Sequence, residues 1–108
     1  MQQIQTNELK EKIKSGENFV LDLYATWCGP CKILMKTLND VEEDIKKKSI
    51  TEPKFKFYKF DIESDKEFVV QELGIRSVPT LKIFSEGKEI FSRPGIMSSN
   101  QIIDLLEK

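Results

Sequence analysis

The chain has 108 residues, the length of one small domain, and 39% of them are hydrophobic, which is enough for one core. Its 17 basic and 18 acidic residues leave a net charge of −1, so it lacks the basic surface typical of nucleic-acid-binding proteins. No apolar run approaches the roughly 18 residues of a membrane span, and residues 1–10 lack the pattern of a signal peptide. We therefore expect one cytoplasmic domain over residues 1–108 that binds neither nucleic acid nor membrane.

The N-terminal part is predicted to form a short strand and a helix. Residues 2–5 suggest an edge strand, and residues 7–15 carry apolar side chains four positions apart, as one face of a helix does. Thr6 or Asn7 is expected to cap the start of this helix, and Gly16 to end it.

A strand and a long helix are expected next. Residues 19–24 (FVLDLY) combine β-branched, aromatic and leucine side chains, which favours a strand. The helix begins at Cys28 or Gly29 and continues to about Lys48. Its apolar positions recur at helical spacing: Ile33, Leu34, Leu38, Val41 and Ile45.

The following segment repeats this order of strand and helix. Residues 54–61 alternate between polar and apolar side chains and are predicted to form a strand. Ser64 and Glu67 have the spacing of a capping box, so a helix should begin there, continue to Leu73 and end at Gly74.

A hairpin and a last helix complete the prediction. Residues 80–93 contain two strand segments around Glu86 and Gly87, and Ser98 or Ser99 is expected to cap a C-terminal helix. The predicted order β-α-β-α-β-α-β-β-α indicates an α/β fold in which helices cover both faces of a mixed sheet. The cysteines then lie where a central strand ends and a helix begins, a usual place for reaction sites in such sheets.

The only two cysteines, Cys28 and Cys31, are open to three interpretations. A structural disulfide would be expected to join distant segments rather than close a ring of about four residues. A zinc site would need carboxylate ligands or a second chain, because the sequence has no histidine. A redox centre needs one thiol of low pKa and a second thiol within reach.

The sequence around the cysteines favours the redox interpretation. At a helix N-terminus, free N–H groups and the helix dipole favour the thiolate form of Cys28. Cys31 lies about one turn further on, within reach of the Cys28 sulfur. Gly29 allows a tight turn, and Pro30 in the first turn loses no helical hydrogen bond.

The chain resembles the thioredoxin family over nearly its whole length. The resemblance rests on FVLDLYATWCGPCK (19–32), KFDI (59–62), LGIRSVPT (73–80), IFSEGKEI (83–90) and Gly95. It implies a mixed sheet flanked by four helices. It also implies a thiol–disulfide oxidoreductase that reduces disulfides in other proteins and is itself reduced by an NADPH-dependent thioredoxin reductase. On this basis we expect a role in electron transport and cell redox homeostasis, in a monomer that needs no metal or organic cofactor.

Five residues match the catalytic positions of the family. Cys28 corresponds to the nucleophile and Cys31 to the resolving thiol. Asp22 corresponds to a buried acid that exchanges a proton with Cys31 through water, although a solvated polar strand face would also explain an aspartate there. Lys59 matches a lysine facing that acid, or is an ordinary surface lysine. Pro79 matches a proline that follows a cis peptide bond beside the disulfide.

A shallow apolar docking face is also implied by the resemblance. Beside Pro79, the backbone of Val78 would pair with an extended substrate segment. The face as a whole would contain Trp27, Gly29, Pro30, Ile75, Val78, Gly95 and Ile96. Core packing is the alternative explanation for each of its aliphatic residues.

Three residues depart from the family pattern. Lys36 replaces a proline that kinks the long helix, so this helix is expected to be straighter. Tyr24 stands where tryptophan is common, and Pro94 where a β-branched residue is common. None of the three is expected to touch the thiols, so the redox assignment does not depend on them.

Two other functions use the same residues. A thiol oxidase or disulfide isomerase would apply the same chemistry in an oxidising compartment. A binding module would dock this face onto a larger enzyme without using the thiols.

Overall fold

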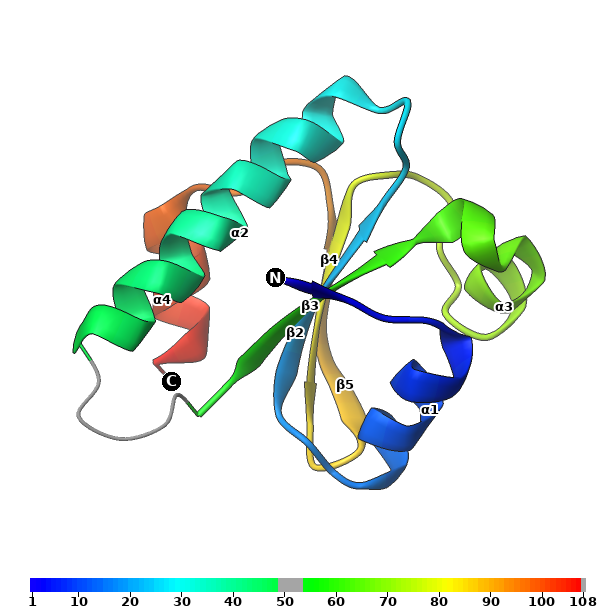
Figure 1. Cartoon of the computed structure of the whole chain (residues 1–108), viewed down its shortest axis with the longest axis horizontal. Coiled ribbons are helices and arrows are strands. Elements are labelled where there is room, and N and C mark those ends of the chain that lie inside the picture. The colour runs from blue at the N-terminus through cyan, green and yellow to red at the C-terminus, as the bar shows by residue number, and fades with distance from the viewer. Residues whose placement is uncertain (49–53, 108) are drawn as a thin grey trace.

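The computed structural model describes residues 1–48 and 54–107 (Figure 1). In chain order the elements are β1 (Gln2–Gln3), α1 (Thr6–Lys14), β2 (Phe19–Tyr24), α2 (Gly29–Lys48), β3 (Lys56–Asp61), η1 (Ile62–Ser64, a 3-10 turn), α3 (Lys66–Gln71), β4 (Thr80–Ser85), β5 (Lys88–Pro94) and α4 (Ser99–Leu106). This is the predicted order, with β1 and β3 each two residues shorter than expected.

The sheet is mixed, as the sequence predicted. Its strand order is β1-β3-β2-β4-β5. β3 is parallel to both β1 and β2, whereas β4 is antiparallel to β2 and to β5. All six residues of β2 are buried, because this strand lies at the centre and both of its faces are covered.

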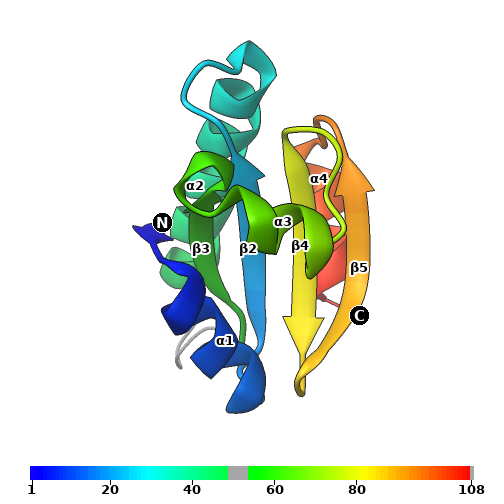
Figure 2. The same ribbon diagram turned by 90° about the vertical axis from the view of Figure 1, so that its right-hand side faces the viewer.

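Helices cover both faces of the sheet (Figures 1 and 2). Phe19, Leu21 and Leu23 of β2 belong to the core that also contains side chains of α1 and α3. Val20, on the opposite face of the same strand, packs into the core formed with α2 and α4. Because side chains alternate along a strand, Asp22 lies on the same face as Val20, towards α2.

The N-terminal caps of α1 and α3 are not the predicted residues. Gln5, not Thr6 or Asn7, caps α1, and its N–H donates to the Glu8 carboxylate at 3.2 Å. The Thr6 hydroxyl donates instead to Asp65 at 2.7 Å. Asp65 lies 59 residues away in the sequence, so the local sequence pattern does not reveal this contact.

Asp65, not Ser64, caps α3. Its carboxylate accepts the Phe68 N–H at 3.2 Å, and the Ser64 hydroxyl donates to the Asp61 carbonyl at 2.6 Å within η1. The predicted capping box was therefore wrong by one residue. α3 also ends at Gln71, before the predicted Leu73.

The hairpin and α4 follow the prediction closely. Glu86 and Gly87 both have positive φ, 54° and 81°, as the two central residues of a type I′ turn require. Of the two candidate caps of α4, it is Ser98 whose hydroxyl accepts the Gln101 N–H, at 3.2 Å.

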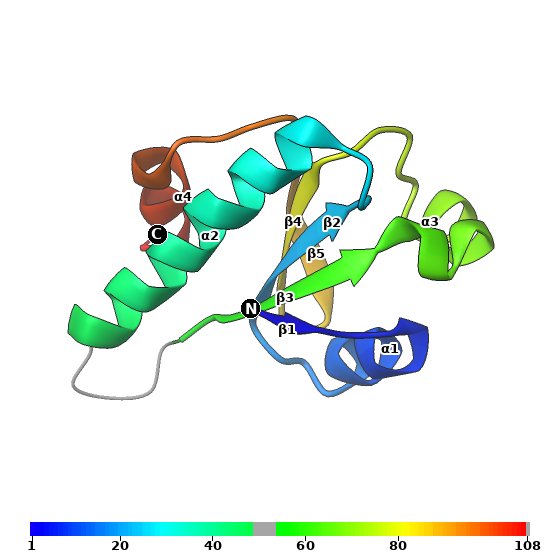
Figure 3. The same cartoon turned by 45° about the horizontal axis from the view of Figure 1, so that its top comes forward.

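The long helix α2 runs without interruption from Gly29 to Lys48 (Figure 3). Lys36 lies on its exposed face and pairs with Asp40, one turn later, at 3.0 Å. The helix begins beside the end of β2, and this places both cysteines at one edge of the sheet.

Candidate active site

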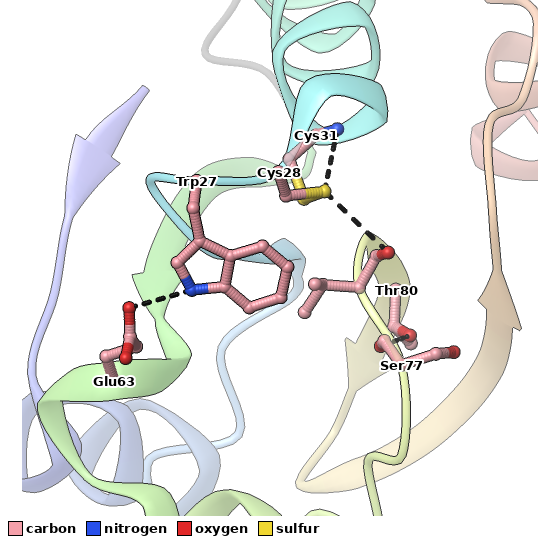
Figure 4. The surroundings of a disulfide bond; sticks show 7 residues. Trp27, Cys28, Cys31, Glu63, Ser77 and Thr80 are labelled. Carbon is pink, nitrogen blue, oxygen red and sulfur yellow. Dashed lines mark hydrogen bonds between the residues drawn. A yellow bond between two sulfur atoms is a disulfide. The ribbon is translucent and has the colours of Figure 1, made fainter.

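The two cysteines form a disulfide at the N-terminus of α2 (Figure 4). Cys28 directly precedes the helix and Cys31 is its third residue, with 5.3 Å between their Cα atoms. The Cys31 N–H points at the Cys28 sulfur, 3.2 Å away. In the reduced protein this donor and the helix dipole would both stabilise a thiolate on Cys28.

The two sulfur-bearing residues differ in accessibility. Cys28 is 5% exposed and Cys31 only 1%, and both pack against Tyr24 and Ala25. Gly29 and Pro30, which separate them, are exposed. A reagent approaching from solvent therefore meets Cys28 first.

A loop from another part of the chain lies against the disulfide. The Cys28 sulfur is 3.8 Å from the Val78 carbonyl oxygen, and the Val78–Pro79 peptide bond is cis. The Gly95 N–H donates to the Pro79 carbonyl at 2.9 Å, which joins the segment before α4 to this loop. The fold thus places Val78 beside the Cys28 sulfur, and Gly95 contacts the next residue, Pro79.

Asp22 is fully buried in the central strand β2, six residues before Cys28. Neither of its carboxylate oxygens has a hydrogen-bond partner among the described residues. Loss of solvation raises the pKa of Asp22 to about 7, and the Lys59 ammonium partly opposes this shift. A solvated strand face is therefore excluded, and the carboxyl group can change its protonation state near neutral pH.

Lys59 lies beside Asp22 on the neighbouring strand. The two residues are register partners in the parallel pair of β2 and β3, so their side chains share one face. The Lys59 ammonium also lies 5.9 Å from the centre of the Tyr24 ring. Tyr24, the residue in place of the usual tryptophan, also packs in the cluster around Cys28 and Cys31, so the expectation that it does not touch the thiols was wrong.

The remaining predicted docking residues are unevenly exposed. Trp27 is 69% exposed and Ile96 46%, whereas Val78 is half-buried. Ile75 is only 6% exposed and belongs to the core around α1 and α3, although it also lines a groove beside Trp27. Most of the Ile75 side chain is therefore buried in the core, as the alternative interpretation held.

One site residue escaped the sequence analysis. The indole N–H of Trp27 donates to the Glu63 carboxylate at 2.9 Å (Figure 4). Glu63 belongs to η1, between β3 and α3, and although it follows the KFDI segment (59–62), no pattern in the sequence marks its own side chain. Only the position of η1 relative to the cysteines could have revealed it.

Residues 1–48 and 54–107 offer no site for a metal ion and no membrane-spanning helix. They contain no group of three or more histidine, cysteine, aspartate or glutamate residues placed to hold a metal ion. None of their helices is long and apolar enough to cross a membrane.

The sequence comparisons with known proteins all point to one family. The family model described as thioredoxin matches residues 1–108. A thioredoxin of Mycoplasmoides gallisepticum is 37% identical over 100 residues, which cover 93% of this chain and 92% of the relative.

Solved structures agree with the sequence relatives. A Plasmodium falciparum thioredoxin superposes with a TM-score of 0.80 at 24% identity, covering 99% of this chain and 97% of the other. A thioredoxin of Halobacterium salinarum superposes with a TM-score of 0.76 at 26% identity, covering 98% and 87%.

Proposed function

The chain belongs to the thioredoxin family of thiol–disulfide oxidoreductases, and we propose that it reduces disulfides in other proteins and is recycled by an NADPH-dependent thioredoxin reductase. One observation carries the proposal: a cysteine pair at the N-terminus of α2, with the sulfur of Cys28 beside the Val78 carbonyl.

In the first exchange the Cys28 thiolate attacks one sulfur of a substrate disulfide. A bond forms between Cys28 and that sulfur, and the other substrate sulfur leaves as a thiolate. The Cys31 N–H, 3.2 Å from the Cys28 sulfur, stabilises the attacking thiolate. The product is a mixed disulfide between the chain and its substrate.

In the second exchange the Cys31 thiolate attacks Cys28. The internal disulfide forms, and the second substrate sulfur leaves as a thiolate and takes a proton. Two electrons have then passed from the dithiol to the substrate. Asp22 supports this step as proton acceptor for the Cys31 thiol, because a buried carboxyl group with a pKa of about 7 exchanges protons at neutral pH.

Substrate docking uses the exposed surface around Cys28. The backbone of Val78 pairs with an extended substrate segment, as in strand addition, and Pro79 fixes the loop that presents it. Trp27, Gly29, Pro30, Ile75, Gly95 and Ile96 complete the face, with Lys59 tuning the charge of Asp22. The chain acts as a cytoplasmic, monomeric single domain over residues 1–108 and needs no metal or organic cofactor.

The decisive test is reduction of insulin with NADPH and thioredoxin reductase. We expect NADPH oxidation that depends on insulin and is abolished by replacing both cysteines with serine. A reduction potential well above that of the cellular dithiol pool would indicate an oxidase or isomerase instead. Full biological function in the double serine variant would indicate a binding module.

A further inference from the structure

Cys31 is closed to solvent, although it lies in the first turn of α2 (Figure 4). Its side chain is 1% exposed, whereas its neighbours Pro30 and Lys32 are exposed. Tyr24 at the end of β2 and Ala25 belong to the same cluster and cover Cys31 on the side of the sheet. The helix must therefore supply cover on its own side.

Met35 is the residue of α2 that is placed to supply this cover. It lies four residues after Cys31, one turn further along the helix, and therefore on the same side of it. Helical side chains lean back towards the N-terminus, so the Met35 side chain extends over the turn that contains Cys31. It packs against the cluster around the two cysteines, yet part of its surface remains exposed. Met35 therefore lies at the boundary between this cluster and solvent.

Two other partly buried side chains, Ile62 and Val78, pack against the same cluster from other elements. Val78 belongs to the loop before β4, and its carbonyl lies 3.8 Å from the Cys28 sulfur. Ile62 belongs to η1. Among the described residues, Met35 is thus the only one of these three that α2 contributes, and it is the one that lies over the resolving thiol.

We propose that Met35 is a positioning residue for the resolving thiol: its side chain covers Cys31 and so restricts this thiol to one reaction, attack on Cys28. The inference rests on the proposed function, in which that attack releases the substrate. A thioether is apolar and flexible, so it fills an irregular gap and offers Cys31 only a weak hydrogen-bond acceptor. Loss of this cover would admit other thiol-reactive molecules to Cys31 and would leave its sulfur in a less defined position.

The first test measures access to Cys31 alone. In the Cys28→Ser background Cys31 is the only thiol, and its alkylation by iodoacetamide is followed as a gain in mass. Met35→Ala removes the cover, and Met35→Leu replaces it with another apolar side chain of similar volume. Ile45→Ala is the matched control, because Ile45 is also a partly buried apolar residue of α2 but packs in the core shared with α4.

We expect Met35→Ala to speed the alkylation of Cys31 about 5-fold or more, because the reactivity of a thiol follows its accessibility. Met35→Val, a milder truncation, should show a smaller rise in the same direction. Met35→Leu and Ile45→Ala should stay within about 2-fold of the Cys28→Ser parent. Urea unfolding of the same proteins gives the stability that each substitution removes, so that general loosening is recognised as an effect common to Met35→Ala and Ile45→Ala.

The second test measures the resolving step in the protein with both cysteines. Each reduced protein is mixed with excess insulin, quenched with acid at set times, alkylated and run on a non-reducing gel. We expect the mixed disulfide to persist about 2- to 10-fold longer in Met35→Ala than in wild type, because the attacking sulfur is less well oriented. Its rate of formation should be unchanged, since that step uses Cys28. Met35→Leu should restore the wild-type lifetime.

Three results would overturn the inference while leaving the proposed function intact. These are unchanged alkylation of Cys31 in Met35→Ala, an equal rise in Ile45→Ala, and resolution of the mixed disulfide at the wild-type rate in Met35→Ala. Failure of the wild-type protein to reduce insulin would instead overturn the proposed function, and with it the role of Met35 in the resolving step.

Discussion

At the scale of single residues, Cys28 and Cys31 differ in the two properties that decide which thiol attacks. Cys28 lies at the start of α2 and is the more exposed of the two, whereas Cys31 lies within the first turn and is 1% exposed. Nucleophilic attack requires both thiolate character and access. The geometry therefore favours Cys28 as nucleophile and Cys31 as resolving thiol.

The first prediction concerns trapping of substrates. Cys31→Ser should still attack protein disulfides through Cys28, but no thiol remains to resolve the product, so mixed disulfides should accumulate. Cys28→Ser should trap far less, because its remaining thiol is nearly inaccessible. Both variants are incubated with cell extract, alkylated and run on a non-reducing gel. Equal trapping, or more trapping by Cys28→Ser, would reverse the assigned roles.

The second prediction concerns Asp22→Asn. An amide cannot accept the Cys31 proton, so insulin reduction should slow at about pH 6–8 while attack by Cys28 on a substrate disulfide remains. Single-turnover experiments separate the two steps, because formation of the mixed disulfide precedes its resolution. A variant that resolves the mixed disulfide at the wild-type rate would exclude Asp22 as the proton acceptor.

At the scale of elements, α2 departs from the family by carrying Lys36 in place of a proline. The side chain is exposed and, among the described residues, pairs with Asp40 at 3.0 Å, so it contributes little to the core. The backbone N–H of Lys36 is the group that a proline would remove. The stability that α2 loses without this N–H depends on whether the fold tolerates a kink at this position.

The third prediction is that Lys36→Pro costs less stability than proline elsewhere in α2. An interior proline normally destabilises a helix by about 3 kcal/mol or more. Asp40→Pro is a matched control, because it breaks the same ion pair one turn further along an exposed face. Urea unfolding should show the smaller loss for Lys36→Pro. Equal losses would mean that the surroundings of α2 have adapted to a straight helix.

At the scale of the whole molecule, the buried carboxyl group of Asp22 links the stability of the fold to pH. Its pKa is raised from 3.8 to about 7 in the folded protein. Between these values the folded chain binds the proton and the unfolded chain does not. The contribution of Asp22 to stability therefore falls as pH rises through this interval, and above about pH 7 the full penalty of a buried charge applies.

The fourth prediction follows from this linkage. Asp22→Asn should be more stable than wild type at about pH 8, by up to about 4 kcal/mol, and the difference should shrink towards pH 4. Urea unfolding of both proteins across this range measures it. A difference that does not vary with pH would show that the carboxyl group does not titrate with a raised pKa.

The order of elements, the mixed sheet and the position of the cysteines were predictable from the sequence, because they depend on local patterns. Hydrophobic periodicity gives each element its type, and Glu86 and Gly87 provide a turn that suits the twist of a hairpin. The same local patterns placed two helix caps wrongly. The Thr6 hydroxyl donates to Asp65, 59 residues away, and the Ser64 hydroxyl donates to the Asp61 carbonyl, so neither residue caps its helix.

Parts of the site could not be predicted from the sequence, because they depend on contacts between segments that are distant in the chain. The sequence marked Asp22 as an unusual residue in an apolar strand, but its burial and its pairing with Lys59 follow from the register of β2 against β3. No local pattern marks the side chain of Glu63, because its hydrogen bond joins it to a tryptophan 36 residues away. Local periodicity thus determined which elements form and where the thiols lie. The packing of distant segments decided which side chains surround the thiols, and burial then raised the pKa of Asp22.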